Sequence, residues 1–163
     1  MVIPAPFHKW AQARGLSAGI NDSPAADPNR DGISNLAHFA FDTDPLGNGG
    51  NEGKQRLELA TDGDSERYLT LTLPVRKNAV FSGSPPQATI DGMIYRIPGD
   101  DDLAAPHTLG TVAVSPALDA GLPALGDYDG TAGADWEYQS FRLSDPITVR
   151  PAGFILKEVS TTP

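Results

Sequence analysis

The segment from Tyr68 to Val75 constrains the fold more than any other part of this chain. Its large apolar side chains occupy every second position, at Leu69, Leu71, Leu73 and Val75. A period of two residues is that of a β-strand with one buried face. The sequence therefore predicts a half-buried strand at 68–75.

Further short strands are predicted around this one. The Asp62-Gly63 step indicates a hairpin turn before Tyr68. The other strand candidates are 57–59, 79–82, 93–97, 109–114, 136–143 and 154–159. Short strands separated by Gly, Pro and Asp turns predict an antiparallel β-sandwich over residues 57–163. Pro74 and Pro98 should lie at sheet margins, because proline donates no ladder hydrogen bond.

The composition agrees with a mainly β chain and limits its partners. The 163 residues include 16 Asp but only 5 Glu, and 17 Gly and 15 Pro, residues that favour turns over helices. A net charge of −9 argues against nucleic acid as a partner and favours a cation. Without cysteine the chain has no disulfide or thiolate metal site. No apolar run is long enough to predict a membrane span.

Residues 1–45 have a different character, with two short helices predicted. Phe7, Trp10 and Ala11 share one helical face, and Gly15 is suited to the C-terminal cap. A second helix is predicted at 35–41. We expect these helices to pack their aromatic side chains on the β domain, with residues 46–56 as a linker.

The strongest chemical signal lies between the two predicted helices. Oxygen-bearing side chains at Asp27, Asn29 and Asp31 fall at positions 1, 3 and 5 of a loop that has glycine at position 6. Ile33 at position 7 can offer its carbonyl and direct its side chain into the core, and Asn35 at position 9 can act through water. This order is that of a calcium loop, which predicts a Ca²⁺ site. In the alternative interpretation, Asp27 and Asp31 only cap the following helix.

Position 12 of the loop departs from the pattern. A calcium loop has a carboxylate there, whereas this chain has His38, which suits a hard cation poorly. We expect water or another acid to complete the site, with Asp22 and Asp42 ranked first and Asp44 also near in sequence. An affinity of about 0.1 to 1 mM is expected, as in extracellular modules.

The first 45 residues resemble a known calcium segment. The residues that carry the resemblance are Trp10, Gly15-Leu16, the run from Asp27 to Ala40, and Asp44-Pro45. They are similar to a segment near the C-termini of large secreted bacterial proteins, related in loop chemistry to dockerins and thrombospondin type 3 repeats. In that family a Glu stands where this chain has His38.

The resemblance extends less specifically into the β region. The matching stretches are 68–75, Ile94-Tyr95, 101–103, 141–143 and 153–155. In the family such modules sit on enzymes, adhesins and autotransported proteins. The resemblance therefore implies an extracellular or cell-surface setting without fixing a ligand.

Other polar clusters are weaker metal candidates. Three consecutive aspartates at 100–102 follow Pro98-Gly99 and are best explained as a solvated turn. The same explanation covers the acids at 127, 129 and 135 and those at 62, 64 and 66.

The strand at 136–143 provides a candidate ligand surface. If Phe141 faces the core, then Trp136, Tyr138 and Arg142 face outward and could bind a sugar ring or a protein partner. Alternatively, a bulge near Gln139 would turn both aromatic side chains inward.

No catalytic motif is recognisable around the three histidines, at positions 8, 38 and 107. We therefore expect a non-catalytic, calcium-stabilised extracellular module: an N-terminal helix-loop-helix cap on a β-sandwich. It would serve as a binding or appendage domain, with carbohydrate or protein as its partner. The alternative is a structural subunit that self-assembles into a surface layer or filament through its strand edges.

Overall fold

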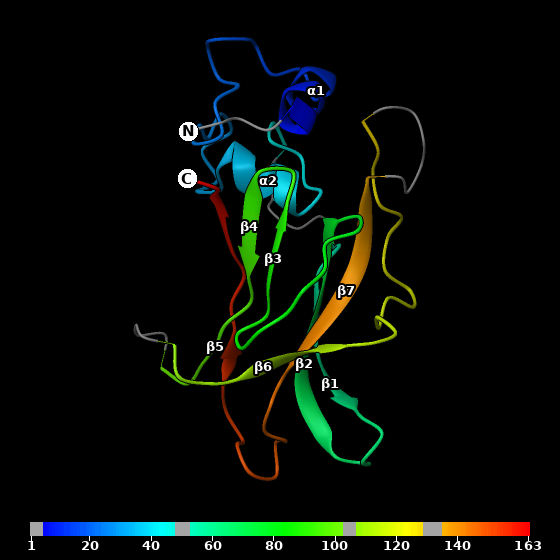
Figure 1. Cartoon of the computed structure of the whole chain (residues 1–163). Coiled ribbons are helices and arrows are strands. Elements are labelled where there is room, and N and C mark those ends of the chain that lie inside the picture. Colours follow the sequence, from blue (N-terminus) through cyan, green and yellow to red (C-terminus); the bar gives the residue numbers. More distant parts are fainter. Residues whose placement is uncertain (1–4, 48–52, 103–106, 129–134) are drawn as a thin grey trace.

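The computed structural model describes residues 5–47, 53–102, 107–128 and 135–163 and is mainly β, with antiparallel sheets (Figure 1). Its elements are α1 (Ala5–Ala13), α2 (Asn35–Ala40), β1 (Arg56–Thr61), β2 (Arg67–Arg76), β3 (Gln87–Ile90), β4 (Met93–Arg96), β5 (Gly99–Asp100), β6 (Thr111–Val114), β7 (Trp136–Leu143), β8 (Phe154–Ile155) and β9 (Glu158–Thr161). Residues 48–52 of the predicted linker, Leu103 and Asp129 lie outside the described residues.

The strands form three antiparallel groups. The largest sheet has the order β1-β2-β7-β6, a second has the order β3-β4-β9, and β5 pairs with β8. The predicted hairpin joins β1 to β2, where the Asp62 N–H donates to the Glu66 carbonyl over 3.0 Å. β2 forms where the alternation predicted a strand, but the prediction that only one face is buried is wrong: Leu71 and Leu73 are buried on one face, and Thr70 and Thr72 are buried on the other.

Pro74 lies at a sheet margin although β2 is a central strand. The pairing of β1 with β2 ends at Thr72, so β2 has only β7 beside it at position 74. A residue without an N–H is tolerated there because one side of the strand carries no ladder.

The observed strands differ from the predicted ones in several places. Residues 79–82 form no strand apart from an isolated bridge at Ser82, and Val80 is 80 % exposed. The strand β3 follows two prolines and was not predicted. The predicted strand at 154–159 is divided at Leu156 and Lys157, because β8 pairs with β5 whereas β9 pairs with β4.

One cluster of buried apolar side chains joins both parts of the chain. The helices contribute aromatic rings to it, and the two larger sheets contribute from their strands. Its fully buried members include Phe7, Trp10, Phe39, Leu73, Val75, Met93, Tyr95 and Phe141. Phe39 of α2 packs against Trp136 of β7 as predicted, whereas Phe7 and Trp10 of α1 pack against Phe39. Ile33 is only half-buried and is not among the buried core residues.

The C-terminal end of α2 is attached to the strands by hydrogen bonds. The Phe39 carbonyl accepts from Trp136 Nε1 over 2.9 Å, and the Ala40 carbonyl accepts from the Tyr95 hydroxyl over 2.8 Å. The two preceding carbonyls accept N–H groups of the following turn. Because the last carbonyls of a helix have no partner within it, these contacts fix α2 against β7 and β4.

The helices lie together at one end of the molecule, next to β3 and β4 (Figure 1). No helix in the described part of the chain is long and apolar enough to cross a membrane.

Candidate metal centre

The loop before α2 gathers the predicted ligands around one tight turn. The two Asp27 carboxylate oxygens accept from the N–H groups of Asp31, over 3.2 Å, and Gly32, over 2.9 Å. Asn29 Oδ1 lies 3.4 Å from the same Asp31 nitrogen, and Asp31 Oδ1 accepts from the Ile33 N–H over 2.8 Å. Gly32 has φ +83°, the conformation that a glycine at position 6 supplies. Three oxygen-bearing side chains therefore surround one short stretch of backbone.

The two acids of this loop are not neutralised by basic side chains. Among the ion pairs of the described residues, none joins Asp27 or Asp31 to a lysine or arginine. The nearest candidate for a charge partner is His38, whose Nε2 lies 3.6 Å from Asp31 Oδ2. The loop therefore concentrates negative charge and oxygen donors, which is the donor set of a hard cation.

Asn35 contains a buried acceptor without a protein partner. Its Nδ2 donates to the carbonyls of Asn21, over 2.7 Å, and Ser23, over 2.9 Å, so the side chain is fixed. The residue is fully buried, and its Oδ1 accepts no hydrogen bond from any residue that the structure describes. A buried acceptor of this kind needs a water or an ion, which fits the predicted role of Asn35 through water.

Asp27 and Asp31 do not cap α2. The N-cap of α2 is Ser34, whose hydroxyl accepts from the Ala37 N–H over 3.4 Å. The structure thus separates the loop from the cap, and the alternative interpretation of these two acids is wrong.

His38, at position 12, is fully buried behind the loop. Its Nδ1 lies 2.7 Å from the Thr43 hydroxyl, while Nε2 faces Asp31. This arrangement suits a side chain that positions Asp31, because imidazole is a poor ligand for a hard cation.

Asp42, one of the two acids ranked first for the missing ligand, belongs to a different network. Its Oδ1 pairs with Arg14 over 3.3 Å, and its Oδ2 accepts from Lys54 Nζ over 3.0 Å and from the Gly126 N–H over 2.6 Å. Its oxygens serve these partners, so the interpretation of Asp42 as a metal ligand is not supported.

Asp22 and Asp44 have different surroundings. Asp22 accepts from the Gly19 N–H within its own turn, over 2.8 Å. Asp44 belongs to the turn that ends at Gly47, whose carbonyl accepts from Asn29 Nδ2 over 2.6 Å. The turn at 44–47 is therefore in direct contact with the loop. This contact was not predicted from the sequence, since it depends on how the chain folds back after α2.

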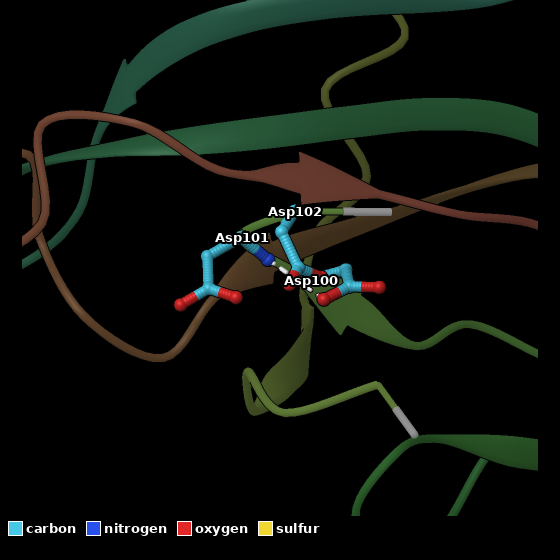
Figure 2. A group of neighbouring side chains, drawn as sticks. All are labelled: Asp100, Asp101 and Asp102. Atoms are coloured by element: carbon cyan, nitrogen blue, oxygen red, sulfur yellow. Dashed lines mark hydrogen bonds between the residues drawn. The ribbon is translucent and has the colours of Figure 1, made fainter. Parts of the chain in front are cut away.

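A second acidic group comprises Asp100, Asp101 and Asp102 (Figure 2). Among the described residues, it is the one group of three His, Cys, Asp or Glu side chains whose ligand atoms all lie within 4.8 Å of one another. Asp100 is buried and lies 2.8 Å from His107 Nδ1, and Asp101 pairs with Arg150 over 3.4 Å. The contact with His107 holds the pKa of Asp100 below its usual range. Asp100 and Asp101 thus have protein partners that compete with a metal.

The candidate ligand surface on β7 is not assembled. Trp136 is 1 % exposed, Tyr138 is half-buried and donates to the Pro123 carbonyl over 2.7 Å, and Arg142 pairs with Asp62 over 2.8 Å. The ladder with β2 continues through Gln139, so no bulge turns the strand.

Trp136 is covered from outside the sheet. Its ring packs against Phe39 of α2 and against Tyr128, at centroid distances of 6.2 and 5.8 Å. The prediction that Trp136 faces outward is therefore wrong, because segments distant in the sequence close over this end of β7.

Comparison with known proteins adds no assignment to this geometry: no family model matches the chain, and neither a curated protein nor a solved structure matches it significantly.

Proposed function

We propose that this chain is a non-catalytic, calcium-stabilised module of an extracellular protein. The observation that carries the proposal is the convergence of Asp27, Asn29 and Asp31 on one turn in which neither acid pairs with a lysine or arginine among the described residues. In this proposal their side chains bind Ca²⁺, the Ile33 carbonyl adds a ligand, and Asn35 acts through water.

A carboxylate from outside the loop completes the proposed site. Asp44 is the better of the remaining acids, because the turn at 44–47 is already hydrogen-bonded to Asn29. With a histidine in place of the usual acid at position 12, we propose an affinity in the range of about 0.1 to 1 mM. Calcium at this concentration is available outside cells, which favours the extracellular setting.

The proposed role of the ion is structural. The loop leads directly into α2, and α2 is fixed to the strands through Phe39 and Ala40. An ion that binds only the folded loop stabilises the whole fold by mass action. We also propose that the two helices and the loop form a cap on a β-sandwich, because the ion would then help to hold this cap against the strands.

The proposal does not include a sugar-binding surface at Trp136, Tyr138 and Arg142, because the first is buried and the other two are engaged within the protein. This surface therefore does not identify the module's partner. The alternative proposal is a structural subunit that self-assembles through its strand edges.

Calcium titration of the melting temperature tests the proposal. We expect Tm to be higher in millimolar Ca²⁺ than in chelator, because bound calcium raises the free energy of unfolding by RT ln(1 + [L]/Kd). The double variant Asp27→Asn, Asp31→Asn should lose this shift. Asp119→Asn removes an exposed acid elsewhere and should retain it. An equal shift in all three proteins, or no shift in the unmodified chain, would exclude a calcium site in this loop.

A further inference from the structure

β1 is a long edge strand with one open side. Among the described strands it pairs only with β2, through six consecutive residues without a bulge. The other edge strands of the two larger sheets, β6, β3 and β9, have four residues each. Of the residues that commonly protect an edge from pairing, β1 has the charged Arg56 and Glu58 but no proline or lysine.

The register shows which backbone groups face outward. The Asp62 N–H donates to the Glu66 carbonyl, so these two residues form a hydrogen-bonded pair. Hydrogen-bonded and non-hydrogen-bonded pairs alternate along an antiparallel ladder. Counting back from Asp62, the N–H and C=O groups of residues 56, 58 and 60 face β2, and those of Leu57, Leu59 and Thr61 face the open side.

The same residues carry exposed apolar side chains. Leu57 is 59 % exposed and Leu59 is 43 % exposed. Leu59 lies opposite Leu69 in the ladder and borders a cavity of about 100 Å³ that Leu143, Ile147 and Pro151 also line. The open edge is thus continuous with an apolar surface, which is uncommon for a solvated strand.

We propose that β1 pairs with β1 of a second copy of this chain, antiparallel, about a two-fold axis at Leu59. Only registers that place residues 57, 59 and 61 opposite one another satisfy the outward backbone groups. An axis at Leu59 uses all three, since Leu57 of one copy then lies opposite Thr61 of the other.

Charge distinguishes this register from its neighbour. An axis at Glu58 would place two glutamates directly opposite each other, which is destabilising. The axis at Leu59 avoids this repulsion, because it places Glu58 opposite the uncharged Ala60. Arg56 and Asp62, which then lie opposite each other, keep their own ion pairs with Glu58 and Arg142 within each copy. Both copies then contribute their leucines to the same face of one continuous sheet. A two-fold contact of this kind closes on itself, so the product is a dimer and not a filament.

Cysteine cross-linking tests the register cleanly, because the chain has no cysteine of its own. In Leu59→Cys the two Cα atoms would lie about 5.5 Å apart, within the range for a disulfide. In the matched control Leu57→Cys, the two Cα atoms would be about 14 Å apart, because they are offset by four residues along the strands and also lie on neighbouring strands. We expect a covalent dimer on mild oxidation of Leu59→Cys and little from Leu57→Cys. Equal cross-linking of both, or of neither, would overturn the register.

Sedimentation of the unmodified chain tests the association itself. We expect a monomer–dimer equilibrium that Leu59→Lys abolishes, since two lysines would meet at the axis. Val80→Lys alters a more exposed apolar residue away from β1 and should leave the equilibrium unchanged. A monomer at every concentration up to about 1 mM, roughly the Kd of a −4 kcal/mol interaction, would overturn the proposal. The sedimentation runs are repeated with calcium and with chelator. Because β1 lies outside the calcium loop, dimer formation in both conditions would support the β1 pairing whether or not the loop binds calcium.

Discussion

His107 lies between two carboxylates, with its Nδ1 2.8 Å from Asp100 Oδ2 and its Nε2 3.0 Å from Glu158 Oε1. Asp100 ends β5 and Glu158 begins β9, so the imidazole links two strands from different sheets. Glu158 also pairs with Arg96 of β4 over 3.1 Å. Only the protonated ring can donate to both acids at once.

This contact makes stability depend on pH. The hydrogen bond to Asp100, followed by the one to Glu158, raises the pKa of His107 above its usual value. The stabilising contribution is therefore complete below about pH 6.5 and is lost as pH rises through the raised pKa. We expect Tm to fall over that window in the unmodified chain and the fall to be smaller in His107→Gln. His8→Gln, which changes an exposed histidine, should keep the full dependence. Parallel Tm–pH curves for the unmodified chain and His107→Gln would contradict the assignment.

The buried carboxylate of Asp42 is expected to be a major determinant of stability. Asp42→Asn would leave Lys54 and Arg14 facing a neutral amide, and removing one partner of a buried ion pair typically costs about 3 to 5 kcal/mol. Backbone strain should not contribute, because asparagine tolerates the positive φ of this position. Urea unfolding measures the loss. Asp119→Asn should change the free energy of unfolding by less than about 0.5 kcal/mol, and a similar small effect of Asp42→Asn would show that the network contributes little.

The sequence predicted the elements whose signals are local. Alternation identified β2 and β7, the Asp62-Gly63 step identified the hairpin, and Gly15, with φ +77°, ends the first helical segment as expected. These patterns depend on residues within about ten positions of one another, so one chain is sufficient to recognise them.

Long-range packing decided what the sequence could not predict. Trp136 follows the alternation of an outward-facing residue, but Phe39, which lies 97 positions earlier, covers it. Asp42 was a plausible metal ligand by proximity in sequence, but Lys54 and Gly126 approach it only in the folded chain. The strand β3 has four residues after two prolines, too few for a period to be visible. The tight turn at 27–32 could be predicted because Asp27, Asn29, Asp31 and Gly32 are close in sequence, and the binding of calcium there stays a prediction.

Restoring a carboxylate at position 12 should strengthen calcium binding. In His38→Glu the new side chain would lie near Asp31 Oδ2, where His38 Nε2 now lies at 3.6 Å. An added charged ligand should lower the Kd for Ca²⁺ by about tenfold or more. In chelator the variant should melt below the unmodified chain, because a buried acid at position 38 would lie next to Asp31 without a cation. Calorimetric titration and Tm with and without calcium measure both effects. His8→Glu adds the same charge at an exposed position and should change neither. A variant that is destabilised equally in both conditions would show that position 12 does not face the ion.

Lys157 should oppose folding at neutral pH. Burial lowers the pKa of its amine to about 8, and the amine lies 4.4 Å from the centroid of the Phe41 ring. Between pH 8 and 10.5, the ordinary pKa of a lysine, the unfolded chain binds more protons than the folded one, so stability should rise with pH over this range. Lys157→Met keeps an apolar side chain of similar length without the charge. We expect Lys157→Met to have a higher Tm than the unmodified chain at pH 6.5, and we expect this difference in Tm to be smaller at pH 9.5. Lys9→Met alters an exposed lysine on α1, and its effect should not depend on pH in this way. If Lys157→Met lowers Tm equally at both pH values, the contact of the charged amine with Phe41 outweighs the cost of its burial.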